Sequence, residues 1–163
     1  MDRRRLGRFG TGLAVALALA CGGGGGEGAG EEAGHQEEAK EGELSAFELE
    51  HGIGPIKERL TLGPNDAGLA ATGKGIFELK CTACHKMGEK YVGPALGEVT
   101  TRRSPEYVMN MILNPMEMVE HHPVAKQLLA EHMTFMANQN LTVEEARAVL
   151  EYLRTQAKGA PAQ

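Results

Sequence analysis

The segment Cys81-Thr-Ala-Cys84-His85 constrains this chain more than any other stretch. The sequence has three cysteines in 163 residues, and two of them stand here with a histidine directly after the second. Two thiols at this spacing on one turn of backbone can meet the two vinyl groups on one edge of a porphyrin. The adjacent histidine can then bind the iron from one face. The segment therefore predicts one covalent haem c, attached through Cys81 and Cys84, with His85 as an axial ligand.

Three other uses of a cysteine pair fit less well. A disulfide between Cys81 and Cys84 would close a loop too small to stabilise a fold much. A thioredoxin-like dithiol needs a βαβ setting, and no convincing strand pattern of period two is present. A structural zinc site needs two further ligands, and there is no second cysteine pair. A haem also suits the composition, because a chain with four Phe and no Trp has few large side chains for a core.

The first 20 residues predict an export signal. Four arginines precede the apolar stretch TGLAVALALA, which is too short to span a bilayer. Cys21 follows Ala-Leu-Ala and precedes glycine, a pattern that resembles a bacterial lipobox, although Ala18 stands where Leu is usual. We therefore expect a lipid on Cys21 that anchors the chain at the periplasmic side of the cell membrane. The alternative is an ordinary cleaved signal beside a free cysteine.

Charge separates the N-terminal part from the rest. Residues 22–50 hold nine Glu and one Lys (1 − 9 = −8), whereas residues 51–163 hold twelve acids and twelve bases. A segment this acidic and this poor in aromatics is expected to be a disordered tether. No basic cluster of the mature chain indicates a nucleic-acid partner. The predicted parts are a signal peptide (1–20), a lipidated Cys with a tether (21–50), an ordered extension (51–65), a folded domain (66–158) and a disordered tail (159–163).

Capping residues and apolar periodicity predict an all-α domain with four or five helices. Segments 86–103 and 133–140 are expected to be loops. The first predicted helix is capped by Asn65 or Asp66 and runs to about Lys80, and the second runs from Ser104-Pro105-Glu106 to Asn114. A third begins at Asn114-Pro115 and bends or breaks at Pro123. The last is opened by the Thr142–Glu145 capping box and runs to about Thr155.

Eight Met and five further His are candidates for a second axial ligand. Met133 and Met136 lie in the loop before the last helix, and either could instead be a flexible core filler. Ligation by a second histidine, His132, is an alternative. Four methionines at core-like spacing are expected to fill the core: Met109, Met111, Met116 and Met118. His121 and His122 are expected at the surface or the rim. A soft copper site is a further alternative, using Met116, Met118, His121, His122, His132 and Met133.

The CTACH segment, the Gly93-Pro94 loop, Met136 and the final ARAVLEYLR stretch occur in an order that resembles class I c-type cytochromes, over residues 66–156. The resemblance implies the class I cytochrome c fold around one haem. It implies Met136 as the sixth ligand, with Met133 as the fallback, because the family's ligand Met lies in the loop before the last helix. It also implies that the Pro94 carbonyl orients His85. Ala137 departs from the family, in which proline often follows the ligand Met.

The same resemblance places three residues where the first and last helices cross, namely Gly73, Phe77 and Tyr152.

A narrower likeness is carried by HGIGPIKERLTLGP, YVGPALGEVTTRRSPEYVMNMILNP and NQNLTVEEARAVLEYLR. These stretches are similar to small monohaem cytochromes associated with bacterial nitrous oxide reductase systems. That likeness implies delivery of electrons to a periplasmic reductase in denitrification. We also expect a quinol-side donor and a monomeric protein.

Both axial positions would be filled in such a carrier, so the domain is not expected to be an enzyme. Six bases and three acids lie between Lys74 and Arg103, and this net positive charge is consistent with an acidic partner. The alternative is scattered, solvated charge. A terminal oxidase or another periplasmic reductase is an alternative acceptor. A haem sensor or a peroxidase-like enzyme with a labile sixth ligand is a second alternative, and copper delivery is a third.

Overall fold

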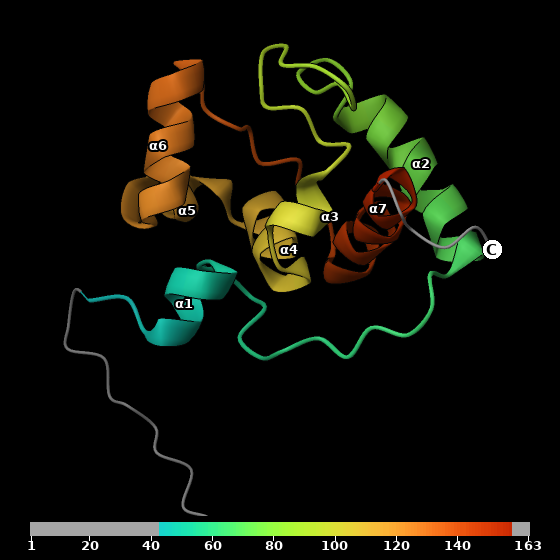
Figure 1. The fold of residues 1–163 in the computed structure, drawn as a ribbon, viewed down its shortest axis with the longest axis horizontal. Helices are drawn as coiled ribbons and strands as arrows, with labels where there is room; N and C mark the ends of the chain where they lie inside the picture. Colours follow the sequence, from blue (N-terminus) through green and yellow to red (C-terminus); the bar gives the residue numbers. More distant parts are fainter. Residues whose placement is uncertain (1–42, 158–163) are drawn as a thin grey trace, which may run out of the picture. The chain divides into compact units, whose positions relative to one another are not determined.

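Two helices from opposite ends of the folded part, α2 (Ala67–Lys80) and α7 (Val143–Gln156), pack against each other and organise the domain (Figure 1). The computed structural model describes residues 43–157. The chain divides into two units, residues 1–36 and residues 37–163, and every described residue belongs to the second unit. Across the described range the secondary structure is helical, without strands, which confirms the predicted all-α class.

The crossing of α2 and α7 depends on a glycine. A Cβ added at Gly73 would collide with the backbone carbonyl of Ala148 on α7, so only glycine allows the two helices to approach this closely. One helical turn further on, the rings of Phe77 and Tyr152 meet with their centroids 5.3 Å apart. Gly73, Phe77 and Tyr152 thus lie at the helix crossing, as the resemblance implied.

Three of the predicted helix starts are confirmed, and each has a local side-chain cap. The Asp66 side chain accepts a hydrogen bond from the Leu69 amide (2.8 Å) at the start of α2. Ser104 caps α4 (Pro105–Leu113) by accepting from the Tyr107 amide at 3.2 Å. A reciprocal capping box between Thr142 and Glu145 opens α7.

Proline divides the middle of the chain as expected. Helix α5 (Pro115–His121) ends where α6 (Pro123–His132) begins, with a proline at the first position of each. The expectation of an uninterrupted loop over 86–103 was wrong, because α3 (Val99–Arg102) forms one helical turn there. Its β-branched composition, Val-Thr-Thr, gives little helical signal in the sequence.

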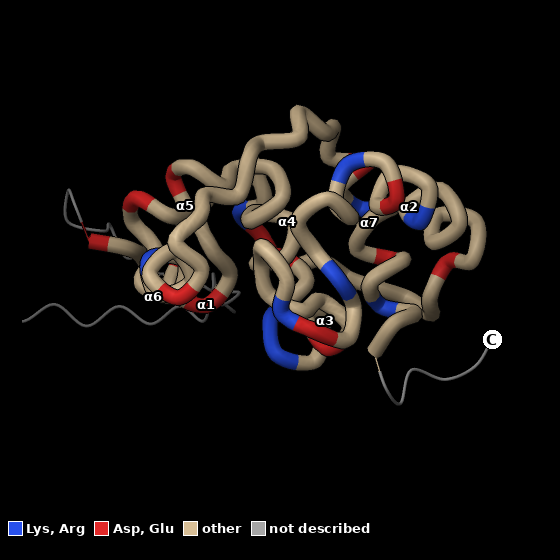
Figure 2. The backbone as a smooth tube through the Cα atoms, turned by 90° about the horizontal axis from the view of Figure 1, so that it is seen from above, with Lys and Arg blue, Asp and Glu red and all other residues tan. Residues whose placement is uncertain are grey.

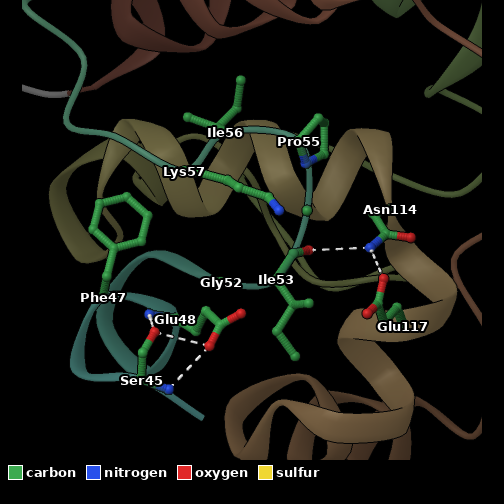
Figure 3. A pocket seen from close by; sticks show the side chains of 11 residues that line it. Ser45, Phe47, Glu48, Gly52, Ile53, Pro55, Ile56, Lys57, Asn114 and Glu117 are labelled. Atoms are coloured by element: carbon green, nitrogen blue, oxygen red, sulfur yellow. Dashed lines mark hydrogen bonds between the residues drawn. The ribbon is translucent and has the colours of Figure 1, made fainter. Parts of the chain in front are cut away.

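A further helix, α1 (Ala46–His51), contradicts the prediction of a disordered tether as far as residue 50. Ser45 accepts from the Glu48 amide (3.2 Å), and the Glu48 carboxylate accepts from the Ser45 amide at 2.9 Å (Figure 3). This capping box is visible in the sequence as Ser-x-x-Glu, but the acidic composition around it obscured the signal. With α1 and α3, the described residues contain seven helices rather than four or five. Cys21, the signal segment and the tail lie outside these residues.

The segment after α1 is held against α4 by buried polar side chains. The Asn110 amide donates to the carbonyls of His51 (3.0 Å) and Ile56 (2.9 Å), and its oxygen accepts from the Ile56 amide at 2.9 Å. The Glu106 carboxylate accepts from the Leu60 amide at 2.6 Å. Residues 51–60 are therefore ordered through hydrogen bonds to one face of α4.

Burial corrects two expectations about individual side chains. Met109 and Met118 are core residues as expected, but Met116 is 54% exposed. His122 was expected at the surface or the rim and is buried instead. Its Nδ1 accepts from the Val124 amide (3.2 Å), so its Nε2–H donates to the Leu49 carbonyl at 3.2 Å. Burial lowers the pKa of His122, which keeps the ring neutral in this role.

The described helices are all too short or too polar to cross a bilayer, so this part of the chain contains no candidate membrane span.

We expect Gly73→Ala to lower the free energy of unfolding by about 1–3 kcal/mol, because the added methyl group separates α2 from α7. Gly75→Ala is the matched control, since no atom lies within 4 Å of a Cβ at that position on the same helix. Replacing an exposed helical glycine by alanine should raise the stability by up to about 1 kcal/mol. Denaturant unfolding of both variants measures this, and equal effects would contradict the role of the crossing.

Candidate functional site

The two cysteines of the CTACH segment follow directly from the end of α2. The Cys81 amide donates to the Phe77 carbonyl (2.9 Å), and the amides of Cys84 and His85 both donate to the Cys81 carbonyl at 3.1 and 2.9 Å. These bonds wind the segment into a tight turn beyond the helix. The thiols are free, not joined in a disulfide, with Cys81 half-buried and Cys84 exposed. Both therefore remain available for attachment to a cofactor.

The protonation of His85 is fixed by a backbone carbonyl. Its Nδ1 lies 3.0 Å from the Pro94 oxygen, and since a carbonyl can only accept, Nδ1 carries the proton. The unprotonated Nε2 is then free to bind a metal. Burial lowers the pKa of His85, an effect that the Pro94 bond partly offsets, so the ring is neutral at neutral pH.

Gly93 lets the proximal loop, residues 86–97, lie against this imidazole. A Cβ at Gly93 would stand 2.5 Å from Cε1 of His85 and 2.9 Å from Nδ1. The Gly93 amide also donates to the Cys84 carbonyl at 2.8 Å, which fixes the loop to the CTACH turn. Glycine followed by proline therefore serves two purposes here: close approach to the ring and a carbonyl aimed at Nδ1.

One cavity brings together the candidate residues from separate parts of the sequence. Cys81, Cys84 and His85 line it from α2 and the turn, and Met136 lines it from the loop before α7. Met136 also packs against the main hydrophobic core, whereas Met133 is 84% exposed and does not line the cavity. Most of the remaining wall is apolar, including Leu96, Val108, Ile112, Leu128, Leu129 and Leu153. Two thiols, an imidazole and a thioether around an apolar cavity fit a covalent haem.

The charged side chains of the cavity wall are all basic: Lys80, Arg102 and Arg103. The Arg102 guanidinium donates to the Ala95 carbonyl at 3.0 Å, and that of Arg103 lies 5.2 Å from the centre of the Tyr107 ring. Such groups suit the carboxylates that a porphyrin carries. In the sequence, Arg102 and Arg103 stand out only as part of the net positive charge of residues 74–103. Their position directly before the Ser104 cap was the one signal that could have placed them at the cavity.

The structure gives the copper alternative no support. Among residues 43–157, no three His, Cys, Asp or Glu side chains are grouped as metal ligands. Two members of the soft set are engaged in internal bonds, since the Met118 sulfur accepts from the Ile53 amide at 3.0 Å and both ring nitrogens of His122 are bonded.

Comparison with known proteins gives consistent results. The family model described as cytochrome c matches residues 70–157. A solved cytochrome c from Rhodothermus marinus is 48% identical, with a TM-score of 0.65, and the match covers 70% of this chain and 98% of that one. An engineered cytochrome c from the same organism, bound to a carbene intermediate, is 49% identical, with a TM-score of 0.62, and the match covers 69% of this chain and 97% of that one.

A curated relative is more distant. Photosystem II extrinsic protein V from Synechococcus sp. (strain JA-3-3Ab) is 30% identical over 105 residues. The match covers 56% of this chain and spans 57% of the length of that relative.

We expect Gly93→Ala to displace the His85 ring and weaken its bond to Pro94. The unfolding free energy should fall by about 1–3 kcal/mol. With a weaker hydrogen bond the imidazole is a poorer donor, so in the haem-loaded protein the midpoint potential should rise. Gly88→Ala is the control in the same loop, because nothing lies within 4 Å of a Cβ there. Potentiometry of both variants tests this, and an unchanged potential in Gly93→Ala would argue against the positioning role.

Proposed function

Because the chain belongs to the cytochrome c family and carries one covalently attached haem c, we propose that its iron is held between His85 and Met136 in an exported one-electron carrier. The class, a class I haem-based electron carrier, follows from the family and the fold. The observation that supports the ligand pair is the shared cavity: Met136 lines the same apolar space as Cys81, Cys84 and the Pro94-bonded His85.

Each residue has a distinct task in this proposal. The haem supplies the one-electron ferric–ferrous couple, and a thioether ligand favours the ferrous form and raises the potential. Pro94 holds the His85 ring in the tautomer that presents Nε2. The apolar wall excludes water, and two filled axial positions leave no open site for a substrate. Electron transfer is therefore the activity we propose, without a catalytic residue.

We expect Met136→Ala to open the sixth position of the iron. The absorption band of thioether-bound ferric haem should disappear, carbon monoxide should bind the reduced protein, and the midpoint potential should fall. Met133→Ala is the control, because this side chain is 84% exposed and its loss should leave the spectrum unchanged. The opposite pattern would move the ligand to Met133. No change in either variant would favour ligation by His132.

A second candidate is a haem protein with a labile sixth ligand, such as a sensor or a peroxidase-like enzyme. It is favoured by one observation, that an engineered relative 49% identical to this chain is described as bound to a carbene intermediate. Carbon monoxide binding to the reduced wild-type protein distinguishes the two, since a firmly six-coordinate carrier resists it.

The location we propose is the periplasmic side of the cell membrane. The support is the sequence pattern of residues 1–21, with arginines, a short apolar stretch and Cys21 after Ala-Leu-Ala. In this arrangement residues 1–20 are removed, Cys21 carries the lipid, and the acidic tether extends from Cys21 to the start of the folded part.

Charge supports an acidic redox partner. The segment from Lys74 to Arg103, which contains the haem-binding turn, has six bases and three acids. Outside this segment, α1 and α5 contain Glu48, Glu50, Glu117 and Glu120 without Lys or Arg. In Figure 2, Lys and Arg positions lie on α2 and beside α3, with acidic positions among them, and acidic positions lie on α5. The net positive charge around the haem-binding turn would attract an acidic partner.

Exposed apolar side chains accompany this positive charge. Leu79 is 87% exposed and Phe135 59% exposed, and Phe135 also lines the cavity. Tyr91 is 55% exposed, with the Lys86 ammonium 5.0 Å from its ring centre. An apolar centre with a charged rim is the usual composition of a transient protein interface. We propose a nitrous oxide reductase as the acceptor and a quinol-side donor, with a terminal oxidase or another periplasmic reductase as the alternative acceptor.

We expect a purified nitrous oxide reductase that is turning over nitrous oxide to oxidise the reduced carrier rapidly at low salt and more slowly at high salt. Lys86→Glu should slow this oxidation by up to about tenfold at low salt, because it reverses the charge beside the exposed Tyr91 ring, where we propose that the partner docks. Lys126→Glu on α6 is the matched control. Stopped-flow absorbance of the haem measures the rate. Absence of oxidation at either salt would remove this partner and direct attention to an oxidase or another reductase.

A further inference from the structure

The segment that contains Met136, residues 133–141, joins α6 to α7 and is bracketed by two unusual backbone conformations. Among the described residues, the non-glycine positions with positive φ are Met133 (51°) and Asn140 (52°), one near each end of this segment. Asn tolerates the left-handed region because its short side chain can bond locally, whereas an unbranched apolar residue such as Met is strained there. The Met136 loop therefore contains backbone strain at its α6 end.

Three side-chain hydrogen bonds connect this loop and the end of α6 to the segments next to the haem-binding residues, and they oppose that strain. At the α6 end, Lys90 donates to the Glu131 carbonyl (3.0 Å), and His132 lies 3.1 Å from the Val92 carbonyl. At the other end, Lys80 donates to the Gln139 carbonyl at 3.2 Å. Lys80 directly precedes Cys81, and Lys90 and Val92 belong to the proximal loop, whose Gly93 lies against His85.

His132 has the central place among these bonds. Because the Val92 oxygen can only accept, Nδ1 of His132 carries the proton and donates it. Val92 precedes Gly93, whose backbone lies against the His85 ring without room for a Cβ. His132 also lines the haem cavity and is the last residue of α6, directly before the strained Met133. It thus ties the start of the Met136 loop to the proximal loop, whose Pro94 carbonyl bonds His85.

We propose that His132 is a positioning residue for the sixth ligand, with Lys90 and Lys80 as its partners in a latch that keeps the Met136 sulfur over the iron. The inference rests on the proposed ligation by Met136. The latch acts on the opening of the loop: while the three bonds hold, the thioether stays on the iron, and breaking them lets the strained loop move away. The lability of the sixth position is then set by residues that do not touch the iron.

The test uses imidazole as a probe that binds ferric iron only after the thioether has left. In the haem-loaded protein, His132→Phe keeps a ring but cannot donate to Val92, so imidazole should bind about 5- to 10-fold faster. His132→Gln, which restores an N–H donor, should return most of the wild-type rate. His121→Phe on α5 is the matched control and should not change the rate. Met133→Gly should slow imidazole binding several-fold, because glycine removes the strain that favours opening.

Each outcome separates the latch from a merely structural role. An unchanged imidazole rate in His132→Phe, with or without a lower unfolding temperature, overturns the inference, and so does equal acceleration in His121→Phe. If His132→Phe does not assemble with haem, Lys90→Met removes the neighbouring bond and should also accelerate binding, with an unchanged rate again counting against the latch. Met136→Ala distinguishes the two proposals: if it leaves imidazole binding as slow as in the wild type, the ligand assignment itself fails.

Discussion

The close approach of α2 to α7 at Gly73 is the constraint on which the rest of the structure depends. The CTACH turn begins where α2 ends, and the Met136 loop ends where α7 begins. The crossing therefore helps to fix the distance between two of the segments that line the cavity. Neither segment has a strand or a long helix of its own to define its position. Contact between backbones, rather than between side chains, sets the geometry of the site.

Helix α4 connects this site to the segment that precedes it in the chain. Val108 and Ile112 face the haem cavity, whereas Glu106 and Asn110 bond the backbone of residues 51–60. One helix thus presents an apolar face to the cofactor and a buried polar face to the extension. Glu106 and Asn110 are buried beneath the extension and bonded to its backbone, so the extension completes the burial of α4.

Local signals in the sequence predicted most of the fold and of the candidate site. Caps at Asp66, Ser104 and Thr142 act within three residues, so the starts of three helices could be read directly. The motif around Cys81 predicted the haem for the same reason. The burial of His122 could not be predicted, because it depends on Leu49, 73 residues away. Helix α1 was not predicted although its Ser-x-x-Glu cap is present, because it follows a strongly acidic stretch whose composition is typical of disorder.

The bonds from Asn110 and Glu106 determine when two backbone amides of the extension become protected from hydrogen exchange. The amides of Ile56 and Leu60 donate to side chains of α4 and not to a neighbouring turn of their own. Their shielding from solvent therefore cannot outlast the α4 helix, while α4 can persist if the extension peels away. These two amide protons report the docking of the extension, and their exchange with deuterium separates its local undocking from the global unfolding of the domain.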